Sequence, residues 1–417
     1  MKVTKFPEFD EILYEHTYKN GFTVFILKKE EIKSSVGSLG IKMGSIDECV
    51  KFDFLQQVIP QGTAHFMEHI LFEKNNTNAF DTFNKIGTFI NASTSFTETI
   101  YTIKTVNDYM TNIYKLLDFV MKPKFHEKNI EQERKIIEQE NQMYINNYQW
   151  NGFFKVLKNL FPNHPINHHI GGDSESLLDI NKTILSDVHQ YFYNYNNAIL
   201  FLVTPMNPNK IFENISSYLS RGKNNIKFSN SRNLECSSKN IVLNETIFAP
   251  LKIPHIYIGF RLFLDIKDVL FYEIILDIFL EYLIGDDSTF YNKMVYNNMI
   301  NSSIEYILNI NKDFSYIIIT VKTTYPQIVI NSILDLFNNV KFDQKKFQKI
   351  KNHKLGSILD SSNSNTWISS KFIKYYFKDS NFLEIIKIIK DITYEEFLEI
   401  PKYVFENSCK TNLIINN

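Results

Sequence analysis

The stretch from Gly62 to Phe72 constrains this chain more than any other, because it predicts a helix carrying two histidines on one face. Its apolar residues recur at helical spacing, at Phe66, Met67, Ile70 and Leu71. His65 and His69 lie one turn apart, with Glu68 on the same side. Two such imidazoles can bind one divalent ion, and the carboxylate can take a proton from metal-bound water. The alternative is a helix with a half-buried histidine pair, and a third ligand would decide between the two.

A glutamate-rich stretch, residues 129–144, supplies candidates for that third ligand. Strong helix formers and the absence of Gly and Pro predict a second helix here. Glu133 and Glu140 are two turns apart and project from the same face. Glu131 and Glu138 form a second pair, interpreted as solvated charge on the outer face. The alternative for all four is an acidic surface helix.

Taken together, these motifs resemble the pitrilysin and mitochondrial processing peptidase superfamily of inverted (His-x-x-Glu-His) zinc peptidases, and within it the small bacterial two-domain branch. The resemblance rests on the histidine motif, followed by Glu133-Arg-Lys-Ile-Ile-Glu-Gln-Glu140. It rests also on Gly44-Ser-Ile-Asp-Glu48 ahead of the metal helix and on Asn91-Ala-Ser-Thr-Ser95. All four motifs occur in the family's order within roughly the first 200 residues.

The resemblance implies a zinc-dependent endopeptidase with one Zn²⁺ per chain. His65, His69 and Glu140 would bind the ion, and Glu68 would act as general base on zinc-bound water. Glu133 matches the auxiliary glutamate that supports the site.

The same resemblance predicts an extended peptide as the substrate. Asn91, Ala92, Ser93 and Thr94 correspond to the family's substrate-binding strand, where a peptide can pair by strand addition. Main-chain hydrogen bonds discriminate little between side chains, so these residues do not predict the sequence specificity of cleavage.

One departure predicts a partner subunit. Family members whose second domain assists catalysis carry an Arg and a Tyr, seven residues apart, after a Gly-x-x-Ser turn. Here Gly285-Asp-Asp-Ser288 leads to Val295 and Ser302 at those positions. Neither side chain can bind a developing oxyanion as an Arg–Tyr pair would. We therefore expect a heterodimer with a zinc-less homologous subunit that supplies the pair.

The rest of the sequence predicts an α+β fold of two similar α/β domains, each a mainly antiparallel sheet with packed helices. The resemblance implies that they form a clamshell or chamber. The zinc-binding domain is expected at 1–219, a Ser/Asn/Lys-rich linker at 220–239 and a metal-free domain of similar element order at 240–417. Residues 49–61 are expected to be a loop or short insertion.

Composition excludes several classes of protein. A hydrophobic content of 44% indicates a packed globular chain. The net charge of −1 lacks the excess of positive charge that is typical of nucleic-acid-binding proteins. Three scattered cysteines favour a reducing compartment, and neither a signal peptide nor a membrane span is expected. We therefore predict a cytoplasmic location.

Three alternatives remain open at this stage. The chain could be a non-catalytic structural or adaptor subunit of a peptidase-like complex. It could be a dedicated maturation protease that cuts one leader peptide or modified peptide. The loop with His164, His168 and His169 is a rival metal cluster, although its prolines and asparagines make the spacing irregular.

Overall fold

The computed structural model describes residues 1–417 except 53–54, 75–76, 221–240, 265 and 405–407. The chain divides into two compact units. Unit 1 consists of Met1–Gln142, the described part of His168–Asn233, and Ser362–Phe377. Unit 2 consists of Met143–Asn167 and the described parts of Leu234–Ser361 and Lys378–Asn417.

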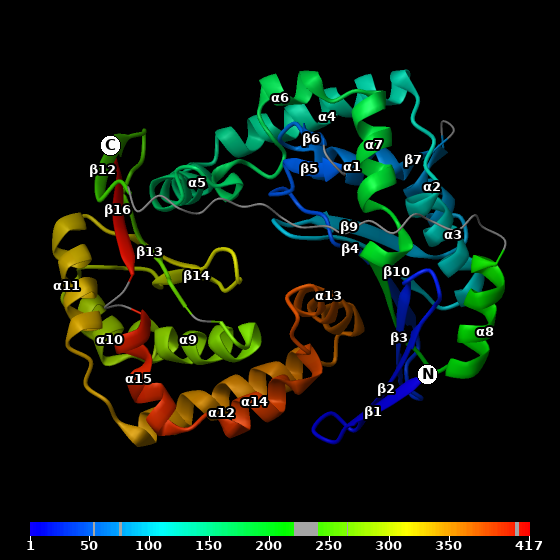
Figure 1. Cartoon of the computed structure of the whole chain (residues 1–417). Coiled ribbons are helices and arrows are strands. Elements are labelled where there is room, and N and C mark those ends of the chain that lie inside the picture. Colours follow the sequence, from blue (N-terminus) through cyan, green and yellow to red (C-terminus); the bar gives the residue numbers. More distant parts are fainter. Residues whose placement is uncertain (53–54, 75–76, 221–240, 265, 405–407) are drawn as a thin grey trace. The chain divides into compact units, whose positions relative to one another are not determined.

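Unit 1 is built on a seven-stranded sheet in the spatial order β1-β2-β3-β11-β4-β10-β9 (Figure 1). Its strands are β1 Lys2–Phe6, β2 Glu11–Thr17, β3 Thr23–Lys28, β4 Ser35–Ile41, β9 Phe89–Thr94, β10 Thr99–Thr105 and β11 Ala198–Thr204. β3 and β11 run parallel, and every other neighbouring pair is antiparallel. The predicted hairpin within residues 12–30 is confirmed as β2 and β3, with Gly21 at φ +87° in the turn.

Helices cover both faces of this sheet. One face packs into the core with helices that include α1 Thr63–Phe72, α2 Ala79–Asn84, α3 Tyr109–Met121, α4 Glu127–Ile145, α6 Ser174–Asp179, α7 Lys182–Phe192 and α8 Pro208–Leu219. The other face packs against α13, Asn365–Tyr376, which lies far along the chain. A Cβ on Gly40 of β4 would lie 2.3 Å from the Ile373 side chain, so glycine permits this close approach.

Unit 2 has a five-stranded sheet in the order β12-β16-β13-β15-β14. Its strands are β12 Asn244–Phe248, β13 His255–Arg261, β14 Glu305–Asn309, β15 Tyr316–Lys322 and β16 Cys409–Asn416. Its helices are α5 Tyr148–Leu160, α9 Val269–Ile284, α10 Thr289–Tyr296, α11 Pro326–Asn338, α12 Gln344–Ser361, α14 Ile385–Asp391 and α15 Tyr394–Val404. α5 packs on β13, where a Cβ on Gly259 would meet Val156 at 2.5 Å.

The two sheets repeat one pattern, which confirms the predicted duplication. The order β3-β11-β4-β10-β9 corresponds strand by strand to β12-β16-β13-β15-β14. In each set the first pair is parallel and the following pairs are antiparallel. α1 is the first helix after β4, and α9 is the first after β13. α9 contains no histidine, so the repeat lacks the metal motif.

The units are not two consecutive halves of the chain, because each contains one helix from the other half of the sequence. α5 belongs to unit 2, and α13 belongs to unit 1. The predicted linker at 220–239 lies outside the described residues apart from Ser220, and the boundaries at 219 and 240 remain predictions. Residues 49–61, expected as a loop or insertion, instead contain a two-stranded ribbon of β5 Cys49–Phe52 and β6 Leu55–Val58.

Within the described part of the chain, no helix is both long and apolar enough to cross a bilayer.

Candidate metal centre

Helix α1 presents both histidines on its less buried side. Its apolar face, including Phe66, Met67 and Ile70, is buried in the core of unit 1. Burial of that face fixes the rotation of the helix about its axis. His65 and His69, one turn apart, are half-buried, and their ring centroids are separated by 4.6 Å. The predicted helix and its histidine pair are therefore confirmed.

Helix α4 brings a carboxylate to this pair. Ile130 and Ile137 bury one side of α4 in the same core. Glu140 Oε2 lies 3.9 Å from His65 Nε2 and 3.6 Å from His69 Nε2. Among the described residues, these three form a group of potential metal ligands whose donor atoms all lie within 4.8 Å of one another.

The donor set fits a zinc ion. Zinc binds imidazole nitrogen and carboxylate oxygen at about 2.0–2.2 Å in a tetrahedron, which places neighbouring donor atoms about 3.3–3.5 Å apart. The distances of 3.6 and 3.9 Å to Glu140 Oε2 come close to this value. Three protein ligands leave a fourth tetrahedral position for a small molecule.

Glu133 contacts one of the two imidazoles. Its carboxylate Oε2 lies 3.2 Å from His69 Nδ1, and its side chain is only 9% exposed. An Nδ1–H donated to this carboxylate would leave the lone pair on His69 Nε2, which lies 3.6 Å from Glu140 Oε2, available to bind a metal ion. The Nδ1 atom of His65 has no such partner among the described residues. Glu131, predicted to be solvated, is exposed and pairs with Arg134 on its own helix.

Glu68 is held from the side of the sheet. Its Oε2 accepts a hydrogen bond from Thr94 Oγ1 of β9 at 2.6 Å. α1 packs on β9, so the contact joins the histidine helix to the edge strand. Glu68 lies outside the group of three potential ligands, which leaves its carboxylate available for proton transfer.

Burial and neighbouring charges shift the pKa values of these groups. Burial, with a smaller contribution from His69, lowers the pKa of His65 to about 3, so this imidazole is neutral and able to bind a metal. Burial raises the pKa of Glu68, and the hydrogen bond from Thr94 opposes that rise. Burial alone would lower the pKa of His69, but the bond to Glu133 and the nearby carboxylates raise it overall.

The predicted substrate strand forms an edge of the seven-stranded sheet. β9 pairs with β10 on one side and is the last strand in the order. Its residues alternate between the two faces of the sheet. Thr94 and Ala92 lie on the face that packs against α1, whereas Asn91 and Ser93 are exposed on the other. The four residues therefore have two different environments.

A buried amide that the sequence analysis did not identify follows Glu140, the third potential ligand, directly in the chain. Asn141 Nδ2 donates to both Gly171 O and Gly172 O at 3.1 Å. These glycines pack on the chain entering α1, where a Cβ on Gly62 would lie 2.5 Å from Gly171 O. The contact ties the end of the Glu140 helix to the start of the histidine helix. No sequence signal marks Asn141, because its partners are backbone carbonyls 30 residues away.

We predict that Asn141→Leu weakens zinc binding through this contact. The substitution would remove the donor to the buried carbonyl of Gly172, a cost of about 1–3 kcal/mol, and the donor to the partly buried carbonyl of Gly171. Asn112→Leu is the matched control, because Asn112 of α3 is also a buried amide that donates to a backbone carbonyl, Asn107 O. We expect both variants to lose stability in urea unfolding, and only Asn141→Leu to lose zinc to a chelating dye. Equal zinc loss in both would trace the effect to general destabilisation.

The histidine-rich loop is not a second metal cluster in the part of the chain that the structure describes. His164 belongs to unit 2, where its Nδ1 accepts from Ile166 N at 3.0 Å. His168 belongs to unit 1 and pairs through Nδ1 with Glu48 Oε1 at 2.7 Å. This contact with Glu48 holds the His168 end of the loop near the segment that leads into α1.

The positions aligned with the family's Arg–Tyr pair lie in unit 2. Ser288 caps α10 as the N-cap residue, which fits the predicted turn. Val295 is 39% exposed near the end of α10, and the helix ends at Tyr296, before Ser302 is reached. Val295 and Ser302 therefore do not share a helix face as a functional pair would.

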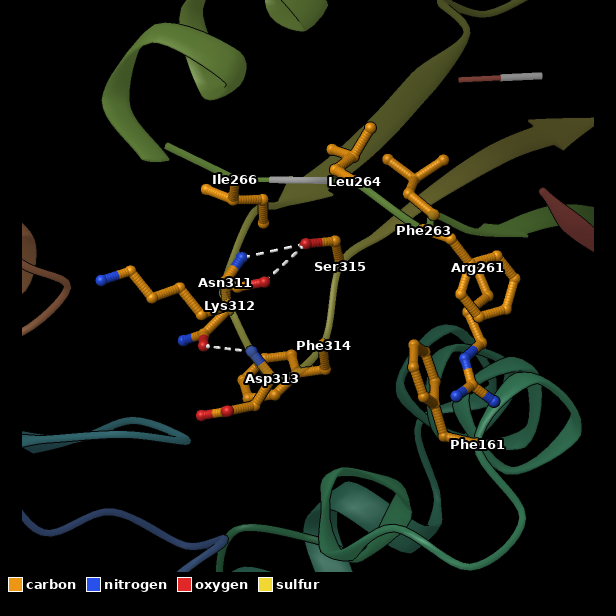
Figure 2. Close-up of a pocket in the computed structure, with 11 residues that line it drawn as sticks. Phe161, Arg261, Phe263, Leu264, Ile266, Asn311, Lys312, Asp313, Phe314 and Ser315 are labelled. Carbon is orange, nitrogen blue, oxygen red and sulfur yellow. Dashed lines mark hydrogen bonds between the residues drawn. The ribbon is translucent and has the colours of Figure 1, made fainter. Parts of the chain in front are cut away.

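A hollow of about 450 Å³ in unit 2 contains an arginine, shown in Figure 2. The Arg261 guanidinium carbon lies 4.8 Å from the ring centroid of Phe161 and 5.1 Å from that of Phe263. Its Nη1 donates to Leu160 O at 3.3 Å, and the residue is 5% exposed. Arg261 is thus engaged by its own unit and does not replace the missing Arg–Tyr pair.

Comparison with known proteins agrees with this geometry. Residues 23–174 match the family model described as insulinase (peptidase family M16), and residues 179–354 match that of the peptidase M16 inactive domain. The uncharacterized zinc protease YmfH of Bacillus subtilis is 28% identical over 410 residues, covering 95% of this chain and 94% of that protein. The beta subunit of the mitochondrial-processing peptidase of Neurospora crassa is 25% identical over 210 residues, covering 49% of this chain and 42% of that protein.

Solved structures show the same fold across the whole chain. An M16-like peptidase from Alicyclobacillus acidocaldarius superimposes with a TM-score of 0.87 at 19% identity, covering 97% of this chain and 98% of the other. A protease from Helicobacter pylori gives 0.85 at 18% identity, with coverage of 97% and 99%.

Proposed function

The chain belongs to peptidase family M16, and from this premise we propose that it is a zinc-dependent endopeptidase acting on extended peptides or unfolded segments. The observation that carries the proposal is the convergence of His65, His69 and Glu140 from two helices, with Glu68 beside them. A buried histidine pair of purely structural purpose does not require that carboxylate.

Each site residue then has a distinct role. His65, His69 and Glu140 would hold the zinc ion. When bound, zinc supplies Lewis-acid chemistry, acidifying water and polarising a peptide carbonyl. Glu68 takes the proton from the attacking water and delivers it to the leaving amine. Glu133 orients His69 by accepting its Nδ1–H.

The edge strand β9 would bind the substrate backbone. An extended peptide can add to the open edge of β9 as a further strand, with main-chain hydrogen bonds providing affinity. This mode suits unfolded segments, because a folded protein offers few free backbone groups. The same site could serve the cleavage of one leader peptide or of many unfolded substrates. The proposed location is the cytoplasm.

We further propose that a zinc-less relative completes the site. Val295 and Ser302 cannot donate to a carbonyl oxygen as the family's Arg–Tyr pair would, which supports a heterodimer. That partner would carry two domains of the same family, no His-x-x-Glu-His motif, and an Arg and a Tyr seven residues apart.

We expect the purified chain to bind zinc but to cleave β-casein, an unfolded test substrate, only in complex with this partner. The measurement is co-purification from the native host with a tagged chain, followed by elemental analysis for zinc and cleavage assays of the chain alone and of the complex. Mass spectrometry identifies the partner and shows whether it carries the Arg–Tyr pair. Robust cleavage by the chain alone would contradict the heterodimer. If the chain contains no zinc and shows no activity in any complex, the result would favour the alternative that it is a non-catalytic adaptor subunit.

A further inference from the structure

The backbone of Thr94 lies at the edge of the sheet, and its side chain contacts Glu68. Ser95 N–H donates to Glu98 O at 2.8 Å, so in the same register the backbone N–H and C=O of Ser93 and Asn91 point toward β10. The backbone N–H and C=O of Thr94 and Ala92 therefore point to the outer edge of β9, where a hydrogen bond from the Thr94 N–H helps to lower the pKa of Glu68. A peptide that adds to this edge would pair with the backbone of Ala92 and with the Thr94 C=O.

The side chain of the same residue contacts the general base. Thr94 Oγ1 donates to Glu68 Oε2 at 2.6 Å, the short distance of a hydroxyl bonded to a carboxylate. Thr99 Oγ1, which donates to Met43 O at 2.9 Å, lies 3.3 Å from Thr94 Oγ1 and restricts its rotamer. The Glu68 carboxylate is thus held from the strand through Oε2.

We propose that Thr94 is a positioning residue that couples peptide docking on β9 to the alignment of Glu68. This inference rests on the proposed peptidase function and deepens it. Pairing of a peptide with the Thr94 backbone restrains β9, and the hydroxyl passes that restraint to the Glu68 carboxylate. The Thr94 hydroxyl already holds the Glu68 carboxylate, and an extended backbone on the edge would restrain the orientation of the base further. The expected substrates are therefore peptides that can adopt an extended conformation and pair with β9 at Thr94.

Two substitutions separate the hydroxyl from the rest of the side chain. Thr94→Val keeps the β-branched shape and removes the donor, whereas Thr94→Ser keeps the donor. With β-casein and the active complex, we expect Thr94→Val to lower kcat about 10- to 100-fold with little change in KM. Thr94→Ser should restore most of kcat. Thr17→Val, which removes one hydroxyl of a Thr17–Thr23 pair elsewhere in the sheet, should leave both parameters unchanged.

A second measurement follows the hydrogen bond without turnover. Infrared spectra of the metal-free chain, with ¹³C-labelled glutamate, report carboxylate stretches, and the Glu68→Gln difference spectrum assigns the Glu68 band. We expect Thr94→Val to shift that band and Thr94→Ser to leave it in place. Adding β-casein should narrow the band in the wild type and not in Thr94→Val.

The outcomes distinguish this inference from the proposed function. A wild-type complex that never cleaves β-casein overturns the proposed function, whatever the infrared band does. An active wild type with an unshifted band and an unchanged kcat in Thr94→Val overturns the role of Thr94 alone. A shifted band that does not respond to β-casein in the wild type overturns the coupling to docking. If Thr94→Val fails to fold, Thr94→Ala removes the same hydroxyl and takes its place.

Discussion

Glu68→Gln is expected to reduce peptide cleavage by about 100- to 10,000-fold while leaving zinc bound, the range typical for loss of a general base. Glutamine keeps the size of the side chain and still accepts the bond from Thr94, but it cannot take a proton. Glu68 lies outside the group of potential ligands, so the affinity for zinc should remain close to that of the wild type. The measurements are the initial rate of β-casein cleavage by the complex and the zinc content of the dialysed chain.

Glu138→Gln is the matched control for this experiment. It makes the same chemical change on α4, at a position outside the potential metal group, and should alter neither cleavage nor zinc content. Loss of zinc in Glu68→Gln would mean that Glu68 is a ligand. Wild-type cleavage by Glu68→Gln would mean that another group accepts the proton.

Much of the metal centre could be predicted from local pattern alone. The four-residue spacing of His65 and His69 and the apolar residues around them define both a helix and its exposed face. The seven-residue spacing of Glu133 and Glu140 does the same for α4. Convergence of the two helices depends on tertiary packing, which no spacing encodes, and the family resemblance provided it. In the structure the potential donor atoms of His65, His69 and Glu140 lie within 4.8 Å of one another.

Features that depend on long-range packing were not predicted. The sequence of α5 shows an amphipathic helix, but nothing in it specifies that its apolar face packs on β13 of unit 2. The sequence of α13 likewise does not specify that this helix, beyond residue 360, packs on the sheet of unit 1. The sequence gives no indication of the contact between Asn141 and the two glycine carbonyls, and it places Thr94 on the substrate strand without indicating its bond to Glu68.

Comparison of the two repeats explains why, among the described residues, the group of potential metal ligands lies in unit 1. Both repeats place a helix after the strand next to the sheet centre, α1 in one and α9 in the other. α1 keeps two histidines at its half-buried surface, whereas α9 is apolar on most of its surface, with 11 residues buried. The partly exposed face of α9 carries Glu273, Asp277 and Glu281 in place of histidines, and Lys378 and Lys354 pair with the first two. The same architecture therefore presents potential metal ligands in one unit and ion pairs in the other.

Glu140→Gln is expected to remove zinc from the dialysed chain and, with it, all peptide cleavage. The carboxylate provides the one negative charge among the three potential ligands, and an amide oxygen is a much weaker donor to zinc. Two imidazoles from one helix remain, which is fewer than the three protein ligands of a catalytic zinc site. The measurements are zinc content by elemental analysis and affinity by competition with a chelating dye.

Glu133→Gln provides the graded comparison, because Glu133 contacts His69 rather than the group of ligand atoms. Its loss should weaken zinc binding by about 10- to 100-fold, as for an outer partner of a ligand, and by less than Glu140→Gln. The two variants differ by position on one helix and not by chemistry, so a general effect of removing a carboxylate from α4 would act on both equally. Stronger zinc loss in Glu133→Gln than in Glu140→Gln would reverse the two roles. Full retention of zinc in Glu140→Gln would mean that the carboxylate is not a ligand and that the histidine pair binds the metal, if at all, in some other way.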